Sequence, residues 1–335
     1  MKGIRKALTF RASSIGDCLM GKYLLENIHA QFPDARLGIV VASRGAMIRD
    51  LLAAYPWIEV IEANRRSPGA LFSFLKDFYG SDLVVTQYAG KHGGSFGLAS
   101  KFVARLLAKR GSLIGFKDVS KWNTALYDHL LPVRSGEAVA EHERETLRAA
   151  GLSVALPFPK LECVRSEAAL SKFGLETGKY MLVHFFAGNT GRSLSPEKSR
   201  EIISALHASL PDMQLVITGG VGDKESALAI AHGLPATVIA GDASLQEMMN
   251  LISQSACVVS VDTGMAHMAA QLGKQLVVLR TCLGPNWWFV EQYGKDAPIT
   301  VLSCDTACAT GHRTTNGYAD CINGISVGEV VSHVA

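Results

Sequence analysis

Short apolar runs alternate with helix-forming segments along most of the chain, and this alternation limits the folds it can adopt. Strands that are each followed by a helix form parallel sheets, so the pattern predicts an α/β protein with doubly wound sheets. Strands are predicted at residues 7–10, 37–42, 57–61, 82–86, 180–186, 214–218, 237–240, 257–261 and 275–280, with helices between them.

Length and composition predict two domains. A chain of 335 residues with 48% hydrophobic content exceeds what one core usually holds. Residues 151–160 contain Pro157 and Pro159 and interrupt the alternation. We therefore expect a first domain at 1–160, a linker at 161–177 and a second domain that begins at 178.

Residues 257–267 carry the strongest functional signature. The apolar strand ends at Asp262, Thr263 and Gly264, and a helix follows directly. Backbone N–H groups at a helix start favour an anion, so a phosphate is expected there. Asp262 either caps this helix or accepts hydrogen bonds from a ligand, and the sequence leaves both roles open.

The first predicted strand is followed by a polar loop and a helix from about residue 18. Ligands of doubly wound domains bind at the carboxyl ends of the strands, so Ser14 and Gly16 are placed to donate hydrogen bonds to one. Without a resemblance to guide it, Asp17 is best explained as the N-cap of the helix. The G-x-G-x-x-G pattern is absent, which disfavours a nicotinamide- or flavin-dependent dehydrogenase.

In the second domain, the loop after the 180–186 strand combines glycines, hydroxyl side chains and one cation, Arg192. These are the parts of a diphosphate-binding loop, and Ser195 and Pro196 predict the start of the next helix. Glu225, with Asp223 as the alternative, is placed to accept hydrogen bonds from ribose hydroxyls. Either acid is equally explained as a residue of the first helical turn, where a negative charge is favourable.

Asp-Thr-Gly-x-x-His after a hydrophobic strand resembles the signature of glycosyltransferase family 9, which contains the bacterial lipopolysaccharide heptosyltransferases. The resemblance in layout covers nearly the whole chain. It implies the GT-B fold, in which two Rossmann-like domains face a central cleft. It also implies metal-independent, inverting transfer of a sugar from a nucleotide donor, ADP-heptose first among the candidates, with no cofactor.

The resemblance also implies roles for individual residues. Domain 1–160 would bind the acceptor, domain 178–320 would bind the nucleotide sugar, and a helix within 321–335 would pack back on the first domain. Asp17 would be the general base that deprotonates the acceptor hydroxyl. The donor would be bound by Thr190, Arg192, Ser193, Glu225, Ala243, Asp262, Thr263, Gly264 and His267.

Two positions depart from the family pattern. Arg192 stands where the family commonly has Lys, and Leu194 stands where it has an aromatic residue. Arg binds phosphate through a planar fork whereas Lys is a point charge, so the geometry of donor binding is expected to differ. Ser244 and Glu247 form a capping box in the sequence, which explains the segment around Ala243 on local grounds as well.

The charge is unevenly distributed, although the net charge is only +3. Residues 1–160 contain 22 Lys and Arg and 14 Asp and Glu, whereas residues 161–335 contain 11 and 16. A basic first half suits a glycolipid or other acidic acceptor or an anionic membrane surface, and nucleic acid is disfavoured. The candidate acceptor-binding residues are Ser14, Gly16, Arg65, Arg66, Lys91 and His92.

Residues 95–110 form a basic amphipathic segment with two explanations. Such a helix contacts a membrane leaflet or packs on the sheet, and packing is the simpler explanation. No apolar run is long enough to span a bilayer and no secretory signal is recognisable, so a cytoplasmic protein is expected, with peripheral membrane contact as an option.

Seven cysteines without a signal peptide argue against a disulfide framework. Cys304, Cys308, His312 and Cys321 have the ligand types of a zinc site, but their spacing fits no standard finger, so thiols without metal are favoured.

Two rival functions stay open. A GT-B-shaped nucleotide-sugar epimerase shares the layout but needs other acid and base groups. A non-catalytic sugar-nucleotide-binding protein would bind the same donor without any role for Asp17.

Overall fold

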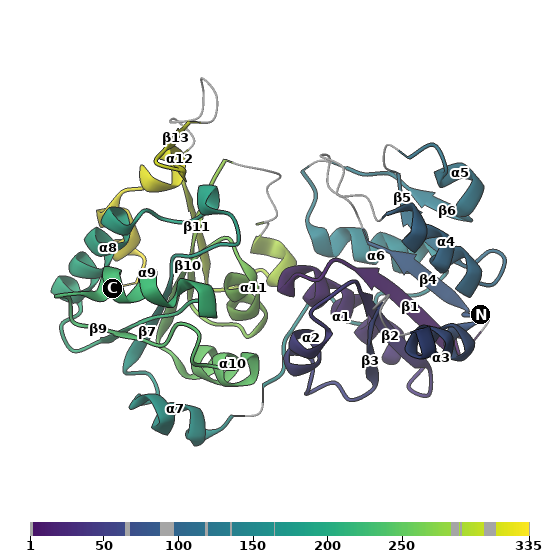
Figure 1. The fold of residues 1–335 in the computed structure, drawn as a ribbon, viewed down its shortest axis with the longest axis horizontal. Coiled ribbons are helices and arrows are strands. Elements are labelled where there is room, and N and C mark those ends of the chain that lie inside the picture. The colour runs from purple at the N-terminus through teal and green to yellow at the C-terminus, as the bar shows by residue number, and fades with distance from the viewer. Residues whose placement is uncertain are drawn as a thin grey trace. The chain divides into compact units, whose positions relative to one another are not determined.

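The computed structural model describes residues 3–63, 68–87, 97–117, 120–134, 136–163, 165–282, 288, 290–304 and 313–334. The chain forms two compact units, Met1–Pro159 and Lys160–Ala335. Each unit holds a six-stranded parallel sheet with helices on both faces (Figure 1). The predicted α/β class with doubly wound sheets is confirmed.

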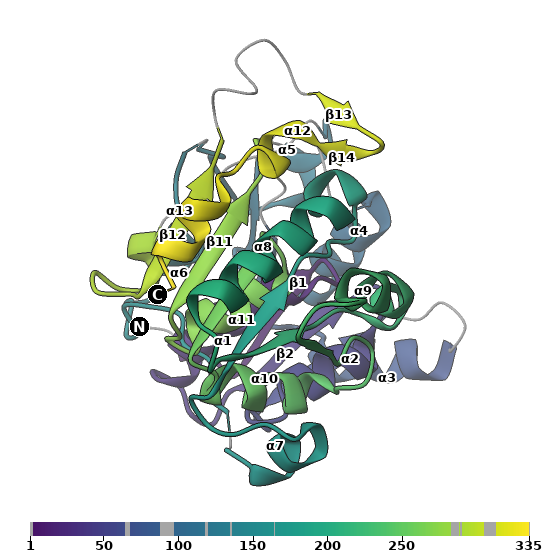
Figure 2. The ribbon, with the colours of Figure 1, turned by 90° about the vertical axis from the view of Figure 1, so that its left-hand side faces the viewer.

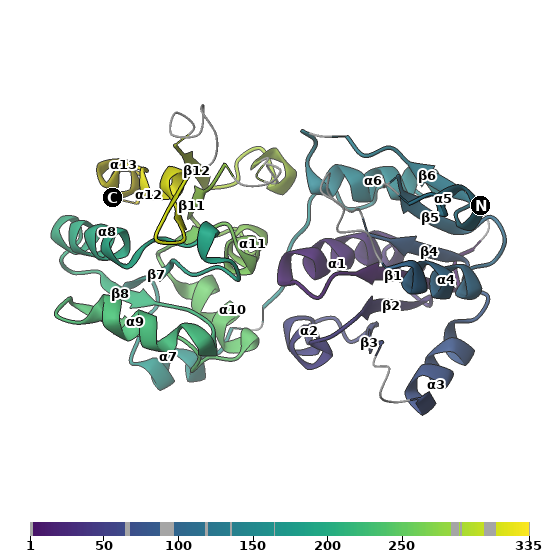
Figure 3. The same ribbon diagram turned by 45° about the horizontal axis from the view of Figure 1, so that its top comes forward.

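The first unit has the strand order β3-β2-β1-β4-β5-β6. Helices α1 and α6 pack against each other on one face of the sheet (Figure 3), whereas α3, α4 and α5 share a hydrophobic cluster with the strands on the other face. Its elements are β1 (Lys6–Arg11), α1 (Ile15–His29), β2 (Arg36–Val41), α2 (Gly45–Leu51), β3 (Ile58–Glu62), α3 (Pro68–Phe78), β4 (Leu83–Thr86), α4 (Leu98–Leu107), β5 (Leu113–Phe116), α5 (Asn123–Leu126), β6 (His129–Leu131) and α6 (Val139–Ala149).

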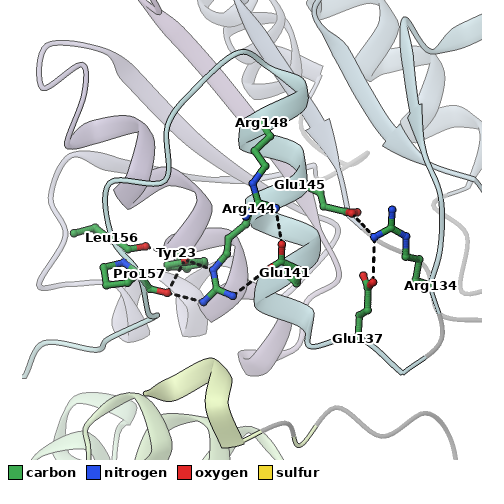
Figure 4. Close-up of polar contacts among 9 residues, drawn as sticks. All are labelled: Tyr23, Arg134, Glu137, Glu141, Arg144, Glu145, Arg148, Leu156 and Pro157. Atoms are coloured by element: carbon green, nitrogen blue, oxygen red, sulfur yellow. Dashed lines mark hydrogen bonds and ion pairs between the residues drawn. The ribbon is translucent and has the colours of Figure 1, made fainter. Parts of the chain in front are cut away.

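The end of the first unit is held to α1 and α6 by one side chain from each helix, Tyr23 and Arg144 (Figure 4). Arg144 donates to the backbone oxygen of Pro157 and to the hydroxyl of Tyr23, and Tyr23 donates to the backbone oxygen of Leu156 at 2.9 Å. These bonds satisfy backbone oxygens in a segment that has no regular structure of its own. The proline-containing segment therefore follows a defined path across α1 and α6.

The second unit has the strand order β12-β11-β10-β7-β8-β9. Helices α8, α9, α12 and α13 contribute to one hydrophobic cluster with the strands, and α8 and α13 lie side by side (Figure 2). Its elements are α7 (Glu167–Phe173), β7 (Tyr180–His184), η1 (Thr190–Arg192), α8 (Pro196–Ser209), β8 (Gln214–Ile217), η2 (Val221–Asp223), α9 (Lys224–Ala231), β9 (Ala236–Val238), α10 (Leu245–Gln254), β10 (Cys257–Val261), α11 (Gly264–Gln271), β11 (Leu276–Arg280), η3 (Val290–Tyr293), β12 (Ile299–Ser303), β13 (Thr314–Thr315), β14 (Tyr318–Ala319), α12 (Asp320–Asn323) and α13 (Val327–Ser332).

Two segments of the second unit add detail to the expected domain organisation. The expected linker at 161–177 contains α7, which Ser166 caps and which contacts α10. The last helix, α13, packs on α8 through the cluster that includes Val330, and its expected packing on the first unit stays a prediction. Among the described residues, no helix combines the length and the apolar character that crossing a bilayer requires.

Candidate functional site

In the first unit, the order of the strands reverses between β1 and β4, and doubly wound sheets bind ligands at such a point. Asp17 and Gln87 meet there. Gln87, directly after β4, donates from Nε2 to Oδ1 of Asp17, and its Oε1 accepts the backbone N–H of Ala12 at 2.7 Å. Ser14 donates its hydroxyl to Oδ2 of Asp17. Both carboxylate oxygens of Asp17 therefore have a fixed hydrogen-bond donor.

The helix α1 begins at Ile15, earlier than predicted, so Asp17 lies in its first turn and not in the preceding loop. Ser14 is the N-cap, and its Oγ accepts the backbone N–H of Asp17 at 3.2 Å. The expectation that Asp17 caps the helix on local grounds is wrong. Its carboxylate is partly buried and faces Ser14 and Gln87, while Gly16 stands beside it in the same turn.

A buried ion pair lies directly before this turn. Arg11, the last residue of β1, binds both carboxylate oxygens of Glu143 on α6 at 2.6 and 2.8 Å, and its Nε donates to Thr9 at 2.7 Å. Arg11 and Glu143 are each 2% exposed. A Cβ at Gly21 would lie 2.9 Å from Cγ and Nε of Arg11, so only glycine lets α1 pass over the guanidinium. The pair fixes the exit of β1 and with it the start of the Asp17 turn.

Four predicted acceptor-binding residues, Arg65, Arg66, Lys91 and His92, lie outside the described residues. Of the candidates for this role, the structure places Ser14, which is exposed, and Gly16, which is partly buried, next to Asp17.

In the second unit, the order of the strands reverses between β7 and β10. The loop after β7 is closed by Ser193, whose Oγ accepts the backbone N–H of Ala187 at 2.8 Å. Asn189 accepts the N–H of Gly191 at 2.9 Å and so begins the η1 turn that carries Thr190 and Arg192. Ser195 caps α8 and Pro196 occupies its first turn, as predicted.

Arg192 has no ion-pair or hydrogen-bond partner for its guanidinium within the described part of the chain, although it is partly buried. Thr190 is exposed beside it, whereas Ser193 is buried and stabilises the loop. A partly buried guanidinium attracts an anion more strongly than a fully solvated one does, because less water screens the charge. The charge of Arg192 is therefore available to an anionic ligand.

After β10, Thr263 is the N-cap of α11 and makes no side-chain capping bond. Asp262 approaches His267, with Oδ1 3.8 Å from Nε2. Thr263, and not Asp262, is the N-cap of α11, so Asp262 has no capping role. The side chain of Thr263 caps none of the N-terminal N–H groups of α11, which begins at Gly264; that they bind a phosphate stays a prediction.

His267 is held by two aromatic residues. Its Nδ1 is 3.0 Å from the hydroxyl of Tyr293, and the buried ring of Trp288 stacks on it with ring centroids 4.6 Å apart. Burial, assisted by the negative charge of Asp262, raises the pKa of Tyr293. A neutral phenol facing Nδ1 and a carboxylate near Nε2 fix the plane of the imidazole ring.

Side chains after β8 and β9 complete this edge of the sheet. Asp223 accepts the backbone N–H of Gly220 at 2.7 Å, so its carboxylate serves its own turn. Glu225 is exposed in the first turn of α9, and its carboxylate has no partner among the described residues. Of the two rivals, Glu225 is the one left available to a ligand. Ala243 is partly buried before α10, where Ser244 and Glu247 form the predicted capping box.

The metal candidates are placed only in part. Cys304 lies with Sγ 3.4 Å from the position of a Cβ on Gly324, and Sγ of Cys321 accepts the backbone N–H of Cys282 at 3.4 Å. Cys308 and His312 lie outside the described residues. Within the described ranges, no three His, Cys, Asp or Glu side chains gather as metal ligands would.

Three residues of these sites gave no signal in the sequence. Gln87 and Tyr293 are single polar residues outside any motif, and the partner of Arg11 lies 132 positions away in sequence. The one available hint was the charged Arg11 at the end of an otherwise apolar strand, since a buried charge requires a partner.

Comparison with known proteins identifies the class to which this fold and these sites belong. Residues 98–288 match the model of glycosyltransferase family 9 (heptosyltransferase), and the chain belongs to that family. It is accordingly a glycosyltransferase with the GT-B type of fold.

Individual relatives are distant in sequence and similar in length. Lipopolysaccharide heptosyltransferase 3 of Escherichia coli is 22% identical over 290 residues, which cover 82% of each chain. The glycosyltransferase family 9 structure from Veillonella parvula has a TM-score of 0.75 at 14% identity and covers 99% of this chain and 97% of its own.

Two further structures come from Escherichia coli. The ADP-heptose heptosyltransferase II has a TM-score of 0.71 at 19% identity, covering 98% of this chain and 97% of its own. The heptosyltransferase WaaC with ADP-2-deoxy-2-fluoro heptose has a TM-score of 0.65 at 19% identity, covering 89% and 92%. At these identities the structural likeness establishes the fold alone.

Proposed function

We propose that this protein transfers a heptose, or a similar sugar, from an ADP-activated donor to a hydroxyl group of a lipopolysaccharide core or a related acidic acceptor, with inversion at the anomeric carbon. The names of the relatives support the donor and acceptor classes, because they include lipopolysaccharide heptosyltransferases and a complex with an ADP-heptose analogue.

Asp17 is the proposed general base. The acceptor oxygen forms a bond to the anomeric carbon and its proton passes to the Asp17 carboxylate, while the bond from that carbon to the diphosphate breaks and ADP leaves. Ser14 and Gln87 hold the two carboxylate oxygens, so the base is oriented before the acceptor arrives.

Donor binding is assigned to the second unit. Arg192 and Thr190 on η1, with the N–H groups at Thr263 and Gly264, bind the diphosphate and stabilise the charge that develops on it. Asp262 and His267 face the sugar, and Ser193 supports the loop. Glu225 accepts hydrogen bonds from the ribose hydroxyls, near the backbone of Ala243. With Arg192 supplying positive charge, we propose that the transfer requires no metal and no other cofactor.

One observation carries this proposal: the partly buried guanidinium of Arg192 has no counter-charge among the described residues, at the edge of the sheet where α11 begins. Such an arrangement fits a diphosphate.

Calorimetry with ADP-, GDP- and UDP-sugars tests the donor assignment. We expect the tightest binding for the ADP-sugar, and equal binding of all three would contradict an ADP-specific site. Incubation with the donor alone separates a transferase from its rivals. A transferase leaves nearly all the donor intact until an acceptor is added, whereas an epimerase or a hydrolase consumes it.

A further inference from the structure

Exposed apolar side chains are concentrated on one layer of the first unit. In the described part of the chain eight large apolar side chains are exposed, and two of them, Val221 and Leu228, belong to the second unit. The other six lie on or beside α3, α4 and α5: Phe72, Tyr79, Leu98, Phe102, Leu106 and Trp122.

Helix α4 is apolar on two sides. Ala104 and Leu107 pack into the cluster beneath the helix, which accounts for one side. Leu98, Phe102 and Leu106 are spaced four residues apart, so they form a continuous stripe on another side, and all three are exposed. Packing on the sheet therefore explains only half of the amphipathic pattern of residues 95–110.

The ring of Trp122, just before α5, extends this stripe. Its centroid lies 6.3 Å from that of Phe102, and Lys101 donates to Asn123 at 2.7 Å to hold the two segments together. We call Leu98, Phe102, Leu106 and Trp122 the α4 surface. Tryptophan with neighbouring aliphatic residues is the composition of a protein surface that enters the headgroup region of a bilayer.

The charges around the α4 surface are cationic. Residues 98–117 contain five Lys and Arg and no Asp or Glu. Arg105 and Lys109 are paired with Asp128 and Asp82, which neutralises those two acids. Arg110 and Lys121 are exposed and have no side-chain partner among the described residues.

We propose that the α4 surface, with Arg110 and Lys121, docks on a membrane that contains anionic lipid. The apolar stripe enters the headgroup region and the cations bind the lipid phosphates. A second copy of this chain fits less well, since a symmetric contact would bring the same cations together. The inference rests on the proposed function in one respect, because a lipid-linked acceptor makes such docking useful.

Vesicle co-sedimentation of the full chain tests this inference. We expect binding to vesicles that contain phosphatidylglycerol, and weaker binding to pure phosphatidylcholine. Lys121→Gln should lower the partition coefficient about fivefold, as expected for one cation at an anionic surface, and added salt should reduce binding further.

Leu106 offers a matched control, because it is 54% exposed and Leu228 on α9 is 53% exposed. Leu106→Gln should lower the partition coefficient about fivefold or more, and Leu228→Gln should leave it unchanged. Equal effects of the two changes, or no vesicle binding by the wild type, would overturn the proposal. The proposal would also be overturned if the wild type does not bind vesicles and light scattering shows that it forms a dimer, which Leu106→Gln splits into monomers.

Quenching of tryptophan fluorescence by brominated lipid tests the same surface without a folding risk. The wild type should be quenched, and most of that quenching should be absent in Trp122→Phe; undiminished quenching in that variant would contradict docking through this surface. Calorimetry with ADP keeps the two proposals apart. A chain that binds ADP but no vesicles defeats the membrane inference alone, and a chain that binds vesicles but no ADP defeats the proposed function alone.

Discussion

Gln87, directly after β4, donates from its Nε2 to Oδ1 of Asp17 in the first turn of α1, while its Oε1 accepts the backbone N–H of Ala12, directly after β1. One side chain after β4 thus fixes both the acid that we propose as the base and the loop that leads to it. Preorganisation of this kind is what lets a base act at the moment the acceptor oxygen attacks.

Gln87→Ala removes this orientation and leaves the carboxylate in place. We expect kcat to fall about 10- to 100-fold, with the KM of the nucleotide donor changed less than about twofold. Steady-state kinetics measure both quantities. Gln31→Ala is the control, because the side chain of Gln31 also makes two hydrogen bonds, from Nε2 to the backbone oxygens of Asn27 and Ser153, away from Asp17. Equal losses in the two variants would remove Gln87 from a positioning role.

Arg192→Ala should weaken ADP binding about 10- to 100-fold, because hydrogen bonds to charged groups contribute about 1.5–3 kcal/mol. Adenosine binding should be unchanged within about twofold, since adenosine has no phosphate. Isothermal titration calorimetry with both ligands measures the difference. Arg200→Ala is the control, because Arg200 on α8 donates to backbone oxygens of Ile230 and His232 at the end of α9. A similar loss for adenosine and ADP would contradict the phosphate role.

The buried pair of Arg11 and Glu143 makes a prediction about stability. Glu143→Gln leaves the buried guanidinium without its counter-charge and should lower the free energy of unfolding by about 3–5 kcal/mol. Urea denaturation measures this. Arg148→Gln, which breaks an exposed pair with Glu141 on the same helix, should cost less than about 1 kcal/mol. Replacing both partners, as Arg11→Met with Glu143→Leu, should recover most of the lost free energy of unfolding. If the double variant is as unstable as Glu143→Gln, the uncompensated guanidinium is not the cause of the loss.

Burial lowers the pKa of His184 to about 4, against an ordinary value of 6.5, although Asp223 opposes the shift. Between these two values the unfolded chain binds a proton that the folded chain does not, so the free energy of unfolding falls as the pH is lowered through this window. Because His184 is partly exposed, we expect an effect of about 1–2 kcal/mol.

His184→Gln retains a hydrogen-bonding group for Thr218, which lies 2.9 Å from Nδ1, and removes the titration. The variant should therefore lose less stability than the wild type when urea unfolding is compared at about pH 7 and about pH 4.5. If the wild type and the variant lose the same free energy of unfolding between these two pH values, His184 is not the group responsible for the pH dependence.

The sequence predicted those features that local patterns determine. The valines of β10 followed by Gly264, and the Ser195–Pro196 start of α8, define their elements through periodicity and capping. The start of α1 was missed because apolar Ile15 precedes Asp17, and Ser14 was the better cap. The hairpin of β13 and β14 has strands too short to leave a pattern.

Contacts between distant segments account for the rest. Tyr293 lies 26 positions from His267 and Gln87 lies 70 positions from Asp17, so no local spacing could have paired them. The family resemblance suggested the proposed role of Asp17, and the fold showed the residues that hold its carboxylate. Glu225 could be separated from Asp223 only when the bond from Gly220 to Asp223 was visible.

The central claim is that Asp17 acts on the acceptor and not on the donor. Asp17→Asn keeps the shape of the side chain and removes its basicity, with Asp34→Asn as the exposed control. The direct test is to measure product formation from the nucleotide sugar and acceptor together with the calorimetric Kd for ADP. We predict a fall in kcat of about 100- to 10 000-fold with the Kd unchanged within about twofold, whereas an unaffected rate, or a loss of ADP affinity that matches the loss of rate, would contradict the account.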